Sequence, residues 1–172
     1  LARQARQSRA WARELLIERV GDSAAEVGLA AYEALTKEDA DKKRANYHLA
    51  ALDSPAAEVR LAGLKGALEA SDPAPLRNRL IELLQTEDLP EFIAAIEALD
   101  KLLPNDAQAF ALAFDSPFYL LRVRAGELCG KRRDSRAVGP MQALLSIPKT
   151  DRVGPCETLR QRAASALADV GD

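Results

Sequence analysis

The chain has 172 residues, of which 48% are hydrophobic and 5% aromatic, and it carries a formal net charge of −2. This length and apolar content exclude a disordered protein, and the weakly acidic balance argues against a general nucleic-acid binder. β-Branched residues are sparse among many alanines and leucines, so the composition favours an all-α protein.

Residues 1–20 are predicted to form the first helix, with Trp11, Leu15 and Leu16 available for burial. With the turn up to residue 22, this segment is either the second helix of a truncated repeat or a cap on the repeats that follow. Its arginines recur at intervals of three and four, which places them in one stripe; they are Arg3, Arg6, Arg9 and Arg13. Such a stripe suits an acidic partner or phosphates.

One short phrase recurs along the chain at an interval of 32 residues, as AAEVGLAA at 24–31 and AAEVRLAG at 56–63. The second copy continues as a frame of five places. The frame is an apolar residue, an arginine, a small residue at the fifth place, an apolar or small residue at the ninth, and an aspartate at the fourteenth. Three copies match every place, beginning at Val59, Leu121 and Leu159. Places one, five and nine lie on one stripe of a helix.

Two further copies match in part, beginning at Val27 and near Glu91. The repeats are therefore expected to start near residues 23, 55, 88, 117 and 156. Matching turns, Asp53-Ser54-Pro55 and Asp115-Ser116-Pro117, open two of them. In each repeat a turn leads from the first helix to a second apolar-periodic segment. Each repeat is thus predicted to be a helical hairpin that buries one face against the next copy.

The stretch from Leu121 to Leu145, LRVRAGELCGKRRDSRAVGPMQALL, resembles the HEAT-like repeats of bacterial and cyanobacterial proteins, including phycobilisome lyases. The resemblance extends over most of residues 23–172. It implies an all-α fold, a single domain over residues 1–172 in which antiparallel helix pairs form a right-handed α-solenoid. It also implies that recurrent Arg and Asp side chains bond backbone groups or each other between adjacent repeats; these are Arg60, Asp72, Arg122, Asp134, Arg160 and Asp172.

In such a solenoid the second helices line a concave surface, which is the expected contact surface for another macromolecule. The predicted partner-binding residues are polar and aromatic residues of these helices: Arg44, Tyr47, His48, Arg77, Arg79 and Gln142. A second basic group crowds the turn between the helices of the fourth full repeat and consists of Lys131, Arg132, Arg133 and Arg136. Its charge suits an acidic partner or phosphates.

No catalytic constellation, metal site or cofactor is predicted, because the single histidine, His48, has no histidine or cysteine at helical spacing. Cys129 occupies the ninth, core place of its repeat and is expected to be a small buried residue, whereas Cys156 falls in a loop. Two cysteines form no disulfide framework, and no apolar run reaches the length of a membrane span. The cytoplasm is therefore the expected location.

The sequence favours a non-catalytic protein–protein interaction or scaffold module, expected to be part of a larger bacterial protein and to bind another protein. The resemblance implies one alternative, a bilin lyase subunit or bilin chaperone. A second alternative is a DNA-binding HEAT-repeat protein, although residues 21–114 carry nine basic and 17 acidic residues. Self-association through the ends of the array is also left open.

Overall fold

The computed structural model describes residues 2–38, 45–147 and 157–171, without the side chains of 2–7, 38 and 107–109. In these ranges the chain forms ten α-helices, two short 3-10 helices and no β-strand, which confirms the all-α prediction. The α-helices are α1 (Ala2–Val20), α2 (Ala25–Glu38), α3 (Ala45–Leu52), α4 (Ala57–Ala67), α5 (Arg77–Leu83), α6 (Leu89–Leu102), α7 (Ala107–Phe114), α8 (Tyr119–Lys131), α9 (Val138–Ser146) and α10 (Glu157–Gly171). The 3-10 helices are η1 (Ala74–Leu76) and η2 (Ser135–Ala137). None of the described helices is long and apolar enough to cross a membrane.

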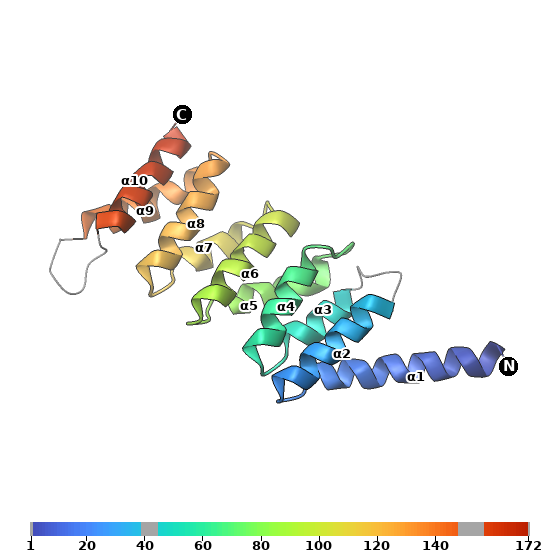
Figure 1. Cartoon of the computed structure of the whole chain (residues 1–172). Helices are drawn as coiled ribbons and strands as arrows, with labels where there is room; N and C mark the ends of the chain where they lie inside the picture. The colour runs from blue at the N-terminus through green and yellow to red at the C-terminus, as the bar shows by residue number, and fades with distance from the viewer. Residues whose placement is uncertain (1, 39–44, 148–156, 172) are drawn as a thin grey trace.

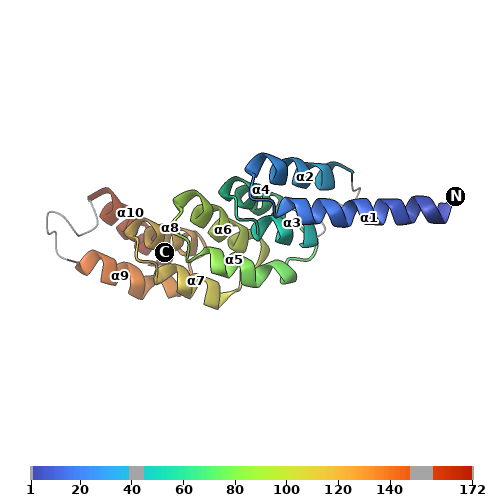
Figure 2. The ribbon, with the colours of Figure 1, turned by 90° about the horizontal axis from the view of Figure 1, so that it is seen from below.

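The helices lie in two layers that advance together along an elongated molecule (Figure 1, Figure 2). One layer contains α2, α4, α6, α8 and α10, and each of these helices contacts the next. The other layer contains α3, α5, α7 and α9, and each of them packs against the first-layer helix that follows it in the chain. Helix α1 packs on α2 and α3, and its N-terminal part projects beyond them (Figure 1). Sequence neighbours are therefore also neighbours in space.

The turns that open the first-layer helices share one hydrogen bond. A side-chain oxygen accepts from the backbone N–H two residues later, at distances of 2.9, 3.3, 3.2 and 3.3 Å for Asp22, Ser54, Thr86 and Ser116. This bond satisfies a backbone donor before the helical ladder starts. In each case the helix begins three residues after the acceptor, at Ala25, Ala57, Leu89 and Tyr119. Four turns are thus built by the same local chemistry at nearly constant intervals.

Frame places one, five and nine face the core in the second and fourth copies, where the residues at these places are buried: Val59, Gly63, Ala67, Leu121, Ala125 and Cys129. The small residue at the fifth place allows close packing. A Cβ added at Gly63 would lie 2.7 Å from the Cβ of Ala51, so glycine is required where α4 approaches α3. One large cluster of buried side chains extends from Leu52 to Ala163, and a smaller one lies among α1, α2, α3 and α4.

The first helix buries fewer residues than the sequence predicts. Leu16 is partly buried against the smaller core cluster, but Trp11 is 65% exposed and Leu15 is 36% exposed. Helix α1 contacts α2 and α3, and residues at i and i+4 on its other side stay on the surface. The first copy also differs from its predicted frame, because Val27 is exposed whereas Gly28 is buried against Val59.

Candidate functional site

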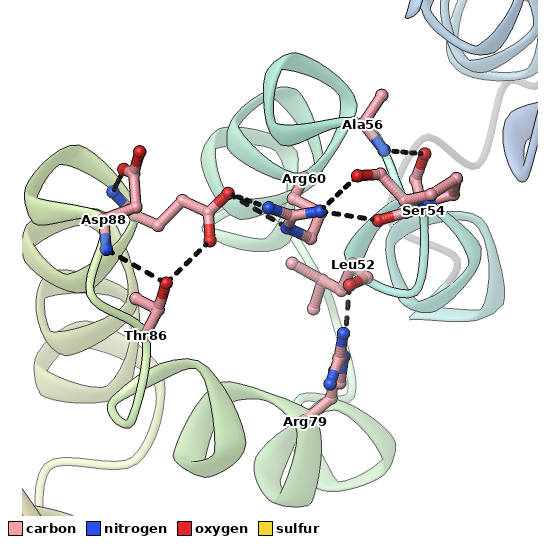
Figure 3. Close-up of polar contacts among 9 residues, drawn as sticks. Leu52, Ser54, Ala56, Arg60, Arg79, Thr86 and Asp88 are labelled. Carbon is pink, nitrogen blue, oxygen red and sulfur yellow. Dashed lines mark hydrogen bonds and ion pairs between the residues drawn. The ribbon is translucent and has the colours of Figure 1, made fainter. Parts of the chain in front are cut away.

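The recurrent Arg60 of α4 joins the turn before its own helix to α6 (Figure 3). Its Nε and Nη2 atoms donate to the Oε1 atom of Glu91 at 2.9 and 2.5 Å, and its Nη1 atom donates to the carbonyls of Ser54 and Pro55 at 2.9 and 2.8 Å. Glu91 is only 1% exposed, and its second carboxylate oxygen accepts from the Thr86 hydroxyl at 3.4 Å. The buried carboxylate is therefore neutralised by the guanidinium of Arg60, and this pair connects α4 to α6.

The other recurrent residues contact a wider range of groups than the resemblance implies. Arg160 donates to the carbonyls of Leu145 and Ile147, and Arg122 lies over the Tyr119 ring at 4.7 Å.

The recurrent aspartates bond within their own turns rather than with Arg60 or Arg122. Asp72 accepts from the N–H of Ala74 at 3.1 Å, and Asp134 accepts from the N–H of Arg136 at 3.0 Å. Aspartates at such positions satisfy backbone donors that the following helical segment leaves without partners. Asp172 lies outside the described residues.

Two of the predicted partner-binding arginines are held in contacts between successive helix pairs. Arg77 donates to the carboxylate of Asp106 through Nε at 2.5 Å and Nη2 at 3.1 Å. Arg79 donates to the carbonyl of Leu52 at 3.1 Å and forms an ion pair with Asp53 at 3.0 Å. The side chains are 35% and 29% exposed, so these residues stabilise the stack and present little of their charge to a partner.

Tyr47 and His48 are each 1% exposed, which contradicts the expectation that they contact a partner. Both side chains point into the core because α3 is covered by α4 and α1. Gln142 on α9 is exposed, as a contact residue must be, and Arg44 lies outside the described residues.

His48 forms a buried hydrogen bond that the sequence analysis missed, between its Nδ1 atom and the Tyr32 hydroxyl at 2.8 Å. A Cβ added at Gly66 would overlap that hydroxyl and lie 2.9 Å from two atoms of the imidazole ring. Burial and the Glu69 carboxylate raise the pKa of Tyr32 to about 12, so the phenol stays neutral. A cavity of about 240 Å³ lies beside the pair, with Lys37 among its lining residues.

The basic turn after α8 divides into two pairs of side chains. Arg132 donates to the carbonyl of Pro104 at 2.9 Å, and Arg136 binds the Asp134 carboxylate and holds its pKa below the ordinary value. Both guanidinium groups also lie 5.4 Å from the centre of the Phe110 ring. Lys131 and Arg133 are instead exposed.

A row of charged side chains, also missed from the sequence, crosses three first-layer helices. Arg124 of α8 pairs with Glu97 of α6 and with Glu127, and Arg162 of α10 pairs with Glu127 at 2.6 Å. Burial acts to raise the pKa of Glu127, but hydrogen bonds and charge from Arg162 and Arg124 outweigh it and lower that pKa. The sequence contains a signal for this row. In the repeating frame, two copies have an arginine at the fourth place, and the copy before each of them has a glutamate at the seventh place.

A groove runs between α8 and α10 beside this row. One part, of about 350 Å³, is lined by Arg124, Glu127, Lys131, Arg162 and Asp169 with small residues of α10. The adjoining part, of about 310 Å³, is lined by Gly130, Lys131, Arg133 and Asp169. Across both parts four basic side chains face two acidic ones, so the groove carries a net positive charge.

A second surface is formed by α1. The exposed side chains of Trp11 and Leu15 share one side of the helix, and Arg9 is exposed on the other side. A groove of about 450 Å³ on the other side of α1 is lined by Arg9, Ala12, Arg13 and Leu16. Arg3 and Arg6, the other members of the predicted stripe, have side chains outside the described set.

No group of three or more His, Cys, Asp or Glu residues is placed to hold a metal ion within the described part of the chain. Cys129 is buried, as its frame place predicts, and burial together with the Asp134 carboxylate raises the pKa of its thiol to about 12. Cys156 lies outside the described residues.

No protein-family model matches the chain. No curated protein matches it with significance. The case for a function therefore rests on the residues and the geometry alone.

Proposed function

We propose that this chain is a non-catalytic protein-interaction module of the cytoplasm, built of HEAT-like repeats that form a right-handed α-solenoid. Three features support the repeat architecture: the four matching turns, the two layers of helices, and ion pairs such as Arg60–Glu91 that join one copy to the next. Arrays of this kind present long surfaces that bind other macromolecules. Buried Cys129, which forms no disulfide, suits a reducing compartment.

The observation that carries the interaction function is the exposure of Trp11. It is the chain's single tryptophan, and 65% of it is accessible, together with Leu15 one turn further along α1. Tryptophan and arginine are the residues that most often dominate the energy of protein interfaces. A projecting helix that exposes a tryptophan and a leucine on one side therefore fits a protein-binding surface.

The test uses tryptophan fluorescence and affinity capture. A partner that covers α1 should shift the emission of Trp11 to shorter wavelength, because the indole leaves water. Trp11→Ala should lower the amount of partner captured from a native lysate at least about tenfold, the loss typical of an interface anchor. Phe118→Ala, which removes an exposed aromatic side chain at the start of α8, is the matched control and should capture the partner normally.

Both variants should keep the melting temperature of the parent chain, since both side chains lie on the surface. Equal capture by the parent chain and Trp11→Ala would contradict the assignment of α1 as the contact surface. Sedimentation velocity of the purified chain distinguishes a foreign partner from a second copy of this chain.

A further inference from the structure

We propose that the cavity between α2, α3 and α4 binds a primary ammonium group, with the Tyr32 hydroxyl, the Thr36 hydroxyl and the Glu69 carboxylate as its acceptors. The ammonium group belongs either to a small alkylamine or to a lysine side chain of another protein. Trp11 does not line this cavity, so the proposal does not depend on the proposed interaction function.

Small residues of α4 make room for the cavity. Ala62 and Gly66 lie one turn apart, and both line it. A Cβ added at Gly66 would overlap the Tyr32 hydroxyl and approach the His48 ring, so glycine leaves these two buried side chains open to the space. The volume of about 240 Å³ is below the roughly 300–1,000 Å³ of sites for drug-sized ligands. The cavity therefore suits a small molecule or a single side chain.

Two hydroxyl groups of the lining have their hydrogens engaged within the protein. With the imidazole hydrogen of His48 on Nε2, the Tyr32 phenol donates to Nδ1 across 2.8 Å. Burial and the Glu69 carboxylate raise the pKa of Tyr32 to about 12, which keeps the phenol protonated. The Thr36 hydroxyl donates to the carbonyls of Tyr32 and Glu33 at 3.0 and 3.1 Å. Towards a ligand both oxygens can therefore act only as acceptors.

The charges of the lining also favour a cation. Glu69 follows the end of α4 and is exposed where it lines the cavity. Lys37, which also lines the cavity, pairs with Glu33 one turn earlier on α2 at 3.0 Å. The charge of Lys37 is therefore compensated, and a ligand meets the negative charge of Glu69. An anion would face this carboxylate and two acceptor oxygens, so it is disfavoured.

A primary ammonium matches this lining better than other cations. It carries three N–H donors, one for each of the three acceptor side chains. A guanidinium carries five donors, which is more than these acceptors can satisfy, and a quaternary ammonium carries none. The Tyr32 ring and the Ala62 methyl group supply apolar surface for the attached alkyl chain.

The test is an NMR titration of the isotope-labelled full chain with n-butylamine at neutral pH. The ring signals of Tyr32 and His48 should show saturable shifts, with a dissociation constant in the millimolar range for so small a ligand. n-Butyltrimethylammonium has the same chain and charge but no N–H, and it should bind at least about tenfold more weakly. The nitrogen shifts of His48 should identify Nδ1 as the unprotonated ring nitrogen.

Two variants test the charge of the acceptor. Glu69→Gln should weaken butylamine binding about five- to tenfold and keep the melting temperature of the parent chain, because Glu69 is exposed. Glu87→Gln is the matched control, since Glu87 is an exposed glutamate in the turn before α6, outside the cavity. It should change binding by less than about twofold.

A second amine distinguishes the two sources of the ammonium group. Nα-acetyl-lysine methylamide carries the same butylammonium chain on a peptide unit. If it binds at least as tightly as butylamine, the cavity takes a lysine side chain of another protein. If it binds clearly more weakly, the cavity takes a free amine.

Several results would overturn the proposal. The absence of a saturable shift with butylamine would do so, as would equal affinity for the quaternary ammonium or a hydrogen on Nδ1 of His48. Equal losses in Glu69→Gln and Glu87→Gln would indicate only the total charge, and tighter binding of butyrate would contradict the cationic ligand. Trp11→Ala should leave amine binding unchanged, so a failure of this inference is distinct from a failure of the proposed function.

Discussion

The interior of this helical stack contains charge at single positions, and Glu91 is the clearest case. Its carboxylate occupies a place that Val59 and Leu121 fill in other copies, and it is buried against Arg60. We predict that Glu91→Ala lowers the free energy of unfolding by about 3 kcal/mol, because it leaves the Arg60 guanidinium without its carboxylate. Urea unfolding of both proteins measures the difference.

Glu97→Ala is the control, since Glu97 is 47% exposed and pairs with Arg124 near the surface. Its loss should stay below about 1 kcal/mol. Equal losses in the two variants would show that burial does not determine the strength of the Arg60–Glu91 pair.

Gly66 is the residue that makes room for the Tyr32–His48 hydrogen bond. We predict that Gly66→Ala costs about 2 kcal/mol of stability, because the new methyl group overlaps the Tyr32 hydroxyl. In the double variant Gly66→Ala/Tyr32→Phe the clashing oxygen is absent, so about half of that loss should be recovered. Gly139→Ala, with no atom within 4 Å of the added Cβ, should be neutral or slightly stabilising. Additive losses in the double variant would contradict the predicted overlap.

The same tyrosine predicts a dependence on alkaline pH. Burial and Glu69 raise the pKa of Tyr32 from 10.0 to about 12, whereas the unfolded chain ionises near the lower value. The contribution of Tyr32 to the free energy of unfolding is fully present below pH 10. It is lost as the pH rises towards 12, because the tyrosine of the unfolded chain releases its proton at a lower pH than that of the folded chain. Two pKa units correspond to roughly 3 kcal/mol.

Urea unfolding between about pH 9 and about pH 11.5 tests this, since the titration window spans that range. Tyr32→Phe should lose less stability across the range than the parent chain. Cys129, whose pKa is also raised to about 12, titrates in both proteins, so the difference between them belongs to Tyr32. Parallel pH profiles would contradict the prediction.

The turns make predictions at the scale of the element. Ser54 and Ser116 are buried, and each accepts a hydrogen bond from the N–H that precedes α4 or α8. We predict that Ser54→Ala and Ser116→Ala each cost about 1 kcal/mol, the value typical of a lost helix-entry hydrogen bond. The two turns share no residue, so the double variant should lose about 2 kcal/mol in thermal or urea unfolding. A loss in one variant alone would show that the turns are not equivalent.

At the scale of the element, four helices begin close to positions that the sequence singles out. The expected repeat starts near 23, 55, 88 and 117 lie within two residues of the first residues of α2, α4, α6 and α8. This agreement is local in origin, since each start depends on one side chain and a backbone donor two residues away. The burial of Trp11 was predicted wrongly, because a helical pattern shows that two residues share a face but not whether another element covers it.

The whole molecule makes a prediction about shape. A compact protein of 172 residues has a radius of gyration of about 16 Å. We predict a clearly larger value by small-angle X-ray scattering, because the two helical layers extend in one direction with few contacts between distant segments. A measured value near the compact one would contradict the stacked arrangement and with it the proposed solenoid.

Local chemistry in the sequence determined the helical class, the positions of the repeating turns and the burial of places one, five and nine in the best-matched copies. Only the tertiary structure decided which charged groups are paired, because the partners lie far apart in sequence. Arg77 and Arg79 stand two residues apart on α5, yet one binds Asp106 in the following segment and the other Asp53 in the preceding one. Residues at this spacing point to nearly opposite sides of a helix, and their partners depend on how neighbouring helices pack. For the same reason, the sequence of this turn does not show that Lys131 and Arg133 are exposed whereas Arg132 and Arg136 are partly buried in contacts with the rest of the chain.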